Sequence, residues 1–198
     1  MRVFDEGHAE LNERTNHLYP ILRANSRTNH VLMRQDSQRL AQLRRHLILD
    51  SAPERAYDEI TRLLATSLEV PITLVNFLDN DRDWFKSAVG LTHRESLVET
   101  SFCDAFFQTS DDIIVVDDTT LDTRFQQHAL VTGAPFIRFY AAARITSGGH
   151  TLGTLCAYDV KPRRISVEQM DTLRTLAAAV MELLGKRSTS LATADGAS

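Results

Sequence analysis

Two β-hairpin turns constrain the fold of this chain more than any other feature of its sequence. Asp79-Asn80-Asp81-Arg82 follows a strongly apolar run, and Ser147-Gly148-Gly149 separates two further runs of strand-like residues. Turns as short as these join neighbouring antiparallel strands. The predicted strands are 72–78, 84–89, 113–116, 138–145 and 150–158. The chain is therefore expected to fold around an antiparallel sheet.

Helical patterns stand before and after these strands. A leucine stripe with spacings of three and four residues predicts a helix over 36–49. Apolar residues recur in the same way over 54–68 and 166–187, which predicts two further helices. Helices that flank a block of hairpins indicate an α+β fold. We expect an antiparallel sheet of five or six strands, with the N- and C-terminal helices packed on one face.

The chain length limits the domain organisation. A chain of 198 residues buries about 70% of its unfolded surface, which suits one sizeable core. Residues 1–35 are polar and irregular, so they predict a leader that is partly disordered or helical. The small polar residues of 188–198 predict a disordered tail. The folded domain is expected over 36–187, and the remaining residues are too few for a kinase, cyclase or DNA-binding domain.

Composition excludes several classes of protein. The formal net charge is -4, so no general positive field attracts nucleic acid or an anionic membrane. No apolar run reaches the roughly 18 residues of a membrane span, and no signal-peptide core is visible. The two cysteines, Cys103 and Cys156, are too few for a disulfide framework. These features predict a cytoplasmic protein with neither a nucleic-acid nor a membrane partner.

Five motifs in the patterned block follow one another in a recognisable order. They are Asp79-x-x-Arg82-x-Trp84-Phe85-Lys86-Ser87-x-x-Gly90-Leu91, Ser101-Phe102-Cys103, Leu121-Asp122-x-Arg124-Phe125, Ile137-Arg138-Phe139-Tyr140-Ala141 and Leu152-Gly153-Thr154-Leu155-Cys156. Together they resemble the GAF domain, and in particular the bacterial subfamily often found upstream of histidine kinase or diguanylate cyclase domains. The resemblance implies a small-molecule pocket on the sheet face away from the helices, under the irregular segment 91–136.

The known ligands of GAF domains require residues that this chain largely lacks. The cyclic-nucleotide signature is present only in part, as Phe107-x-x-x-Asp111-Asp112 without the preceding Asn-Lys. A bilin-binding cysteine is usually followed by His, whereas Asp104 follows Cys103 and Ala105 stands where the subfamily commonly has His. The 7 histidines form no i, i+3 or i, i+4 pair that would bind a metal or haem. We therefore expect no covalent bilin, haem or metal, and the ligand stays open.

The resemblance and the strand pattern together indicate candidate ligand-binding residues. Arg138 and Tyr140 alternate on one face of a predicted strand, which suits an anionic or carboxylate ligand. The alternative is an ion pair of Arg138 with Asp117 or Asp122. Asp117 ends an apolar strand and is a candidate to face the pocket, whereas Arg124 is a candidate to clamp the loop through Asp122. The remaining candidates, each of which also suits plain core, are Trp84, Phe85, Phe102, Cys103, Phe106 and Phe125.

One departure from the subfamily concerns the pocket itself. Where members often read Tyr-Ala-Gly-Ala-Pro-Leu, this chain has Tyr140-Ala141-Ala142-Ala143-Arg144-Ile145. Ala142 fills space that glycine would leave open, and Arg144 adds a charge and an N–H donor in place of proline. Both changes predict a narrowed or closed pocket.

The two cysteines support an alternative function. One class of GAF-fold enzyme reduces free methionine sulfoxide with cysteine thiolates, which requires a lowered thiol pKa and a resolving cysteine. Cys103 lies in the first turn of a predicted short helix over 102–108, where the helix dipole stabilises a thiolate. Cys156 lies in mid-strand and is interpreted as a small buried hydrophobic residue. Sensor members of the subfamily share both cysteine motifs, so a non-enzymatic role is favoured.

Three functions follow from these patterns. The first is a stand-alone sensory or regulatory module that binds a small molecule or a partner and signals in trans, for example to a separate kinase or cyclase effector. The second is the thiol-dependent reductase, with Cys103 and Cys156 as catalytic residues. The third is a degenerate domain that serves only dimerisation. In GAF-like sensors the terminal helices often form a dimeric bundle, so a homodimer through these helices is expected.

Overall fold

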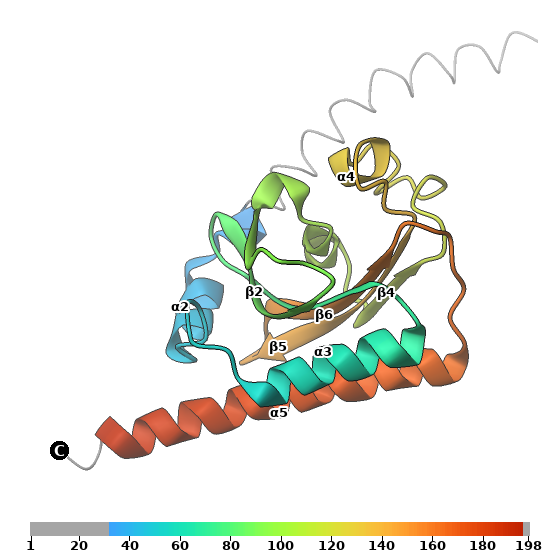
Figure 1. The fold of residues 1–198 in the computed structure, drawn as a ribbon. Coiled ribbons are helices and arrows are strands. Elements are labelled where there is room, and N and C mark those ends of the chain that lie inside the picture. The colour runs from blue at the N-terminus through green and yellow to red at the C-terminus, as the bar shows by residue number, and fades with distance from the viewer. Residues whose placement is uncertain (1–31, 196–198) are drawn as a thin grey trace, which may run out of the picture.

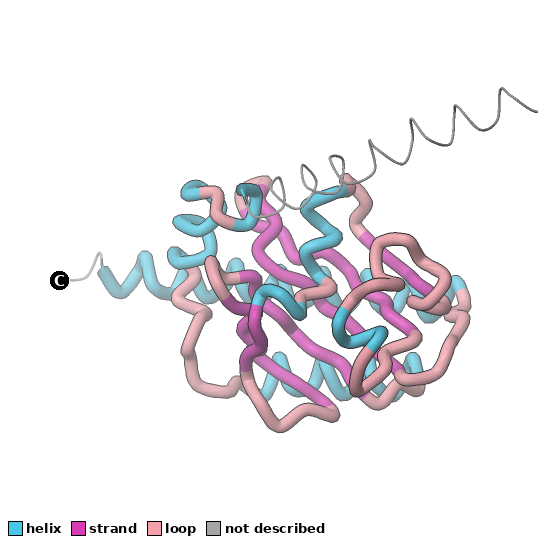
Figure 2. The backbone as a smooth tube through the Cα atoms, turned by 90° about the horizontal axis from the view of Figure 1, so that it is seen from above, coloured by secondary structure: helices cyan, strands magenta, loops and turns pink. Residues whose placement is uncertain are grey.

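One antiparallel sheet forms the centre of the domain (Figure 2). The computed structural model describes residues 32–195, and within them the strand order is β3-β2-β1-β6-β5-β4 with every neighbouring pair antiparallel. The strands are β1 Ile72–Leu78, β2 Arg82–Val89, β3 Glu95–Leu97, β4 Ile113–Val116, β5 Phe139–Ser147 and β6 His150–Asp159. The predicted α+β fold with five or six strands is confirmed.

Two long helices cover one face of this sheet. Helices α3 (Arg55–Leu68) and α5 (Val167–Asp195) lie side by side beneath it, and α2 (Ser37–Arg45) lies at one end (Figure 1). The expected packing of terminal helices on one face is therefore present. The opposite face carries, among residues 32–195, the short helix α4 (Ala129–Thr132) and the 3-10 helices η1 (Val98–Thr100) and η2 (Cys103–Gln108).

Alternation along the strands divides the interior into two cores. In β5, Phe139 and Ala141 belong to the core between the sheet and the helices. Their neighbours Tyr140 and Ala142 belong to a second core on the opposite face, together with Phe102. Because apolar residues cover both faces, the central strands are continuous apolar runs in the sequence.

A local irregularity in β2 sets the direction of two adjacent aromatic residues. The register between β1 and β2 shifts at Lys86, which has no partner in the ladder. Trp84 packs against Phe77 on the helix side, with ring centroids 6.5 Å apart. Phe85 belongs to the core on the other face. The sheet therefore presents Phe85, and not Trp84, to the face where a pocket is expected.

Both ends of the domain differ from the expected bounds. Arg34, which was assigned to the polar leader, is only 1% exposed, so the folded unit includes residues before 36. The rest of the leader, 1–31, lies outside the described residues. Helix α5 continues to Asp195 instead of ending at residue 187, because no glycine or proline interrupts 186–195. Among residues 32–195, no helix is long and apolar enough to cross a membrane.

Candidate functional site

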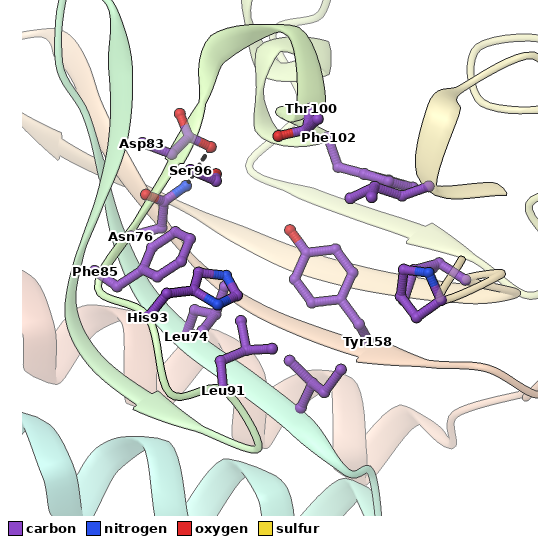
Figure 3. A pocket seen from close by; sticks show the side chains of 14 residues that line it. Leu74, Asn76, Asp83, Phe85, Leu91, His93, Ser96, Thr100, Phe102 and Tyr158 are labelled. Atoms are coloured by element: carbon purple, nitrogen blue, oxygen red, sulfur yellow. Dashed lines mark hydrogen bonds between the residues drawn. The ribbon is translucent and has the colours of Figure 1, made fainter. Parts of the chain in front are cut away.

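A cavity of about 180 Å³ lies on the sheet face opposite α3 and α5 (Figure 3). Strands β1, β2 and β6 form its floor, while the segments around β3, η1 and α4 form its walls. The lining residues are Ile72, Leu74, Asn76, Asp83, Phe85, Leu91, His93, Ser96, Thr100, Phe102, Leu130, Pro135, Ile137 and Tyr158. The sequence predicted a pocket on this face under the segment 91–136, and the cavity occupies that position.

The cavity has a polar end and an apolar end. Figure 3 shows Asn76, Asp83 and Ser96 together at one end, with Leu74 and Leu91 toward the other. Asn76 and Asp83 are almost fully buried, at 1% and 3% exposure. Buried polar groups need hydrogen-bond partners, so the contacts of this pair define the chemistry of the polar end.

Asp83 accepts hydrogen bonds from three different parts of the chain. Its Oδ1 accepts from Arg34 Nη2 at 2.6 Å. Its Oδ2 accepts from Asn76 Nδ2 at 2.9 Å and from Ser101 Oγ at 2.7 Å. The amide oxygen of Asn76 is buried and has no hydrogen-bond partner among the described residues. The polar end is therefore rich in acceptors, one of which is unsatisfied.

Arg34 connects this end of the cavity to the start of the domain. Besides Asp83, its guanidinium donates to Asp104 Oδ1 at 2.5 Å and to the backbone oxygen of Asp79 at 2.8 Å. Burial raises the pKa of Asp104 to about 6, and the nearby charge of Asp83 adds to this effect although Arg34 opposes it. One buried cation is thus shared by two carboxylates.

The two thiols lie beside the cavity and do not line it. Cys103 and Cys156 are both 0% exposed. Cys103 Sγ lies 3.0 Å from Thr154 Oγ1 and 3.4 Å from Asn76 Nδ2. A hydrogen bond with Cys156 lowers the pKa of the Cys103 thiol, whereas burial raises the pKa of Cys156 well above its usual value. The thiols are neighbours, but protein atoms cover both of them.

The aromatic candidates separate into three groups. Phe85 and Phe102 line the cavity. Phe106 and Phe125 belong to the surrounding core on the same face, where Phe125 stacks on Phe102 with ring centroids 4.9 Å apart. Trp84 lies on the helix side of the sheet because strand neighbours point to opposite faces, so it is not part of the cavity wall.

The predicted charged candidates lie away from the cavity wall. Asp117 pairs with the exposed Arg164 at 3.5 Å, so its carboxylate does not face the cavity. Arg124 binds Asp122 at 2.6 Å, which is the loop clamp considered from the sequence. Arg138 donates to the backbone oxygen of Val131 at 2.9 Å, and no ion pair of Arg138 with either aspartate is present among the described residues.

Tyr140 and Arg144 act in the packing around the cavity. Tyr140 is fully buried, and its hydroxyl donates to Cys103 Sγ at 3.5 Å. Arg144 donates to the backbone oxygens of Phe106 and Thr109, at 3.1 and 2.7 Å. It therefore ties the segment after η2 to β5 and does not enter the cavity. Neither Arg144 nor Ala142 lines the cavity, which is not closed. That the two residues narrow it stays a prediction.

Sequence reasoning missed most of the polar lining. Asn76 could have been found from the sequence, because an amide side chain is unusual in a strand of mostly apolar residues. Asp83 gave no such signal, since aspartate is common next to hairpin turns. His93, Ser96 and Thr100 lie in a segment without apolar periodicity, and only the fold brings them to the cavity.

These features define a class of small α+β domain, in which helices cover one sheet face and a lidded cavity lies on the other. The family model that matches this chain is the GAF domain, over residues 52–184. The chain belongs to the GAF domain family.

Comparison with known proteins supports this assignment. A cyclic di-GMP phosphodiesterase of Pseudomonas aeruginosa is 37% identical over 117 residues, which are 59% of this chain and 20% of that protein. This chain therefore corresponds to about a fifth of that relative's length. The GAF domain of an Acinetobacter phosphoenolpyruvate-protein phosphotransferase superposes with a TM-score of 0.56 at 19% identity, covering 76% of this chain and 95% of that one.

An enzyme with this fold is also similar in structure. A free methionine-R-sulfoxide reductase of Neisseria meningitidis, solved with its substrate, gives a TM-score of 0.54 at 13% identity. The superposition covers 76% of this chain and 89% of the reductase. At this identity the likeness concerns the fold alone. This fold thus occurs both in a GAF domain of a phosphotransferase and in a reductase, so the fold alone does not distinguish a sensor from an enzyme.

Proposed function

We propose that this GAF domain is a non-enzymatic sensory module, which binds a small molecule in the cavity and passes the signal to an effector in trans. The observation that carries the proposal is the cavity itself, whose walls come from β-strands and from short helical segments of the lid. Buried polar groups without partners lower the stability of a domain. A cavity with such groups at one end is therefore better explained by ligand binding than by a degenerate domain that binds nothing.

The terminal segments are the proposed output. Asp83 contributes to the cavity wall and binds Arg34, which precedes α2. An occupant that changes the contacts of Asp83 therefore acts directly on the N-terminal end of the domain. The long helix α5 packs along the same sheet and extends to Asp195. We infer that the homodimer expected from the sequence would form through these terminal helices.

We infer the nature of the effector from one relative. The similar Pseudomonas aeruginosa protein is a cyclic di-GMP phosphodiesterase, and a segment like this chain makes up 20% of it. This supports an effector that breaks down a second messenger, and the kinase or cyclase expected from the sequence is the alternative. The signal would reach that enzyme through the terminal helices.

The burial of the thiols favours a sensor over a reductase. A catalytic thiolate has to meet its substrate, which requires an accessible sulfur atom. Cys103 and Cys156 are both 0% exposed and are absent from the cavity wall. A comparison of NADPH-coupled methionine sulfoxide reduction by the wild-type protein and by Cys103→Ser tests the point. Equal rates agree with the sensor, and a loss of activity specific to Cys103→Ser favours the enzyme.

Native mass spectrometry of the protein purified from its own host tests the proposed function. We expect a bound small molecule that Leu74→Trp displaces, because Leu74 lines the cavity. Leu63→Trp is the matched control, since Leu63 is 55% exposed on α3 and lies outside the cavity wall. A wild-type protein that carries nothing, and binds nothing from a host extract, would favour the degenerate domain.

A further inference from the structure

The charges around the cavity determine which ligands it accepts. No lysine or arginine occurs among the described residues that line it, and its carboxylate is Asp83. The nearest buried cations are already engaged. Arg34 binds Asp83 and Asp104, while Arg39 donates to the backbone oxygens of Arg34 and Leu78. An anionic group at the polar end would meet a carboxylate without a free cation, so the cavity disfavours anions.

A cationic ligand is also unsuited to this end. The charge of Asp83 is balanced at 2.6 Å by Arg34, and both side chains are almost completely buried. A second cation would therefore lose its hydration without gaining an unpaired carboxylate. The electrostatics of the cavity favour a molecule without net charge.

Hydrogen bonding at the polar end calls for a donor. An ionised carboxylate has about four acceptor positions, and Asp83 uses three of them for Arg34, Asn76 and Ser101. The amide oxygen of Asn76 accepts no hydrogen bond within the part of the chain that the structure describes. The hydroxyl of Ser96, at the same end in Figure 3, adds an adaptable group. An occupant with an O–H or N–H is able to donate to the acceptor position of Asp83 that the protein leaves unused.

The volume of the cavity and its apolar lining limit the size and polarity of the rest of the ligand. A cavity of about 150 Å³ lined by Leu, Ile and Phe accommodates benzene in another protein. The cavity here measures about 180 Å³, and Leu74, Phe85 and Ile137 are among its many apolar wall residues. A single ring with one small substituent matches this space, whereas a nucleotide or a tetrapyrrole greatly exceeds it.

We propose that the cavity binds an uncharged, single-ring-sized molecule whose hydrogen-bond donor faces the Asp83–Asn76 end. This inference rests on the proposed function, because it names the ligand class of the same site. It excludes anionic ligands such as cyclic nucleotides from this cavity. It also makes Asn76 and Asp83 the residues that determine specificity, while the apolar wall supplies most of the binding free energy.

Three matched probes test this ligand class. Phenol and toluene have nearly the same shape, but only phenol donates a hydrogen bond, and benzoate carries a negative charge. Each is titrated into the ¹⁵N-labelled full chain, and the shifts of cavity-wall amides are followed by NMR. We expect phenol to bind about fivefold more tightly than toluene, the factor for one net hydrogen bond. Benzoate is expected to bind at least tenfold more weakly than phenol.

Variants at the polar end make the test specific. Asn76→Leu keeps the approximate shape of the side chain, removes its polar atoms and frees a second acceptor position on Asp83, so phenol should keep or increase its advantage while toluene binds as before. Asn80→Leu is the matched control, because Asn80 is exposed in the turn after β1 and does not line the cavity. If Asn76→Leu does not fold, Ser96→Ala serves instead, and phenol should lose affinity while toluene binds as before.

The possible failures are distinguishable. Tighter binding of benzoate or toluene than of phenol would overturn the proposed ligand class and leave the cavity as a binding site. If none of the three probes shifts the cavity amides, the cavity does not admit a molecule of this size, and the proposed sensory function fails with it.

Discussion

Replacement of Arg34 by methionine is the sharpest test of how the domain is held together. Methionine keeps much of the length of the side chain and removes the guanidinium. Arg34 is 1% exposed and contacts two carboxylates, at 2.6 Å for Asp83 and 2.5 Å for Asp104. These partners are 49 and 70 residues away in the sequence, so the contact joins distant parts of the chain.

The expected loss follows from the burial of both partners. Removal of one member of a buried ion pair costs about 3 to 5 kcal/mol, mostly because the other charge stays buried and unpaired. Asp104 is able to limit this loss by binding a proton, since burial already raises its pKa to about 6. Asp83 would keep only the hydrogen bonds from Asn76 and Ser101. We therefore expect Arg34→Met to lower the free energy of unfolding by about 3 kcal/mol at pH 7.

Urea unfolding at 25 °C measures this loss. The chain has 1 tryptophan, Trp84, which is buried at 4% exposure and reports the unfolding of the core by fluorescence. Arg55→Met is the matched control, because Arg55 pairs with Glu59 on the surface and its side chain is 89% exposed. That control should change stability by less than about 0.5 kcal/mol. A loss below about 1 kcal/mol for Arg34→Met would refute the reasoning that Arg34 is an essential buried partner.

Three further predictions concern stability. Burial raises the folded-state pKa of Asp104 to about 6, so the folded protein holds a proton that the unfolded chain releases near pH 4. The stabilising contribution of this group is complete below about pH 4 and is lost as the pH rises to 6. In Asp104→Asn this pH-dependent decrease in the free energy of unfolding, up to about 3 kcal/mol, should be absent. Chemical denaturation curves recorded between pH 4 and 7 measure it. A methyl group at Gly153 would lie 2.1 Å from the backbone oxygen of Asn76, so Gly153→Ala should cost about 3 kcal/mol in urea unfolding, and a neutral result would contradict the close approach of β1 and β6. Arg144→Met should cost about 2 kcal/mol and increase hydrogen exchange in 106–111, because it frees backbone oxygens that Arg144 binds; unchanged exchange there would argue against this role.

The sheet was predictable because its signals are local. The strand β4 was predicted with its observed bounds, since β-branched residues fill both faces of a short run. The hairpin turn before His150 likewise fixed the pairing of β5 with β6. Before and after β4, however, the segment 91–136 lacks apolar periodicity, so neither β3 nor α4 could be assigned from the sequence. The cavity walls come largely from this segment, which is why the pocket could be expected while its lining could not.

The role of Arg34 likewise could not be predicted from the local sequence. Polar residues follow it in the sequence, and arginine is almost never fully buried unless it is paired. Nothing local to residue 34 indicates the carboxylates that bury it, because both belong to distant segments. In contrast, Asn76 is a polar residue within a mostly apolar strand, and such a residue is a better guide to a site than the aromatic residues, most of which belong to the core.

The position of Asp83 connects the cavity of the proposed sensor to its N-terminal segment. Three of the roughly four acceptor positions of this carboxylate are occupied, by Arg34, Asn76 and Ser101. An uncharged donor is able to take the remaining position without displacing Arg34, whereas a cation would compete with Arg34 directly. The ligand class inferred for the cavity therefore leaves the connection to the N-terminal segment in place. A ligand that binds the folded state stabilises it, and with it the contact between Asp83 and Arg34. The same carboxylate thus accounts for the selectivity of the cavity and for the route by which its occupancy reaches the end of the domain.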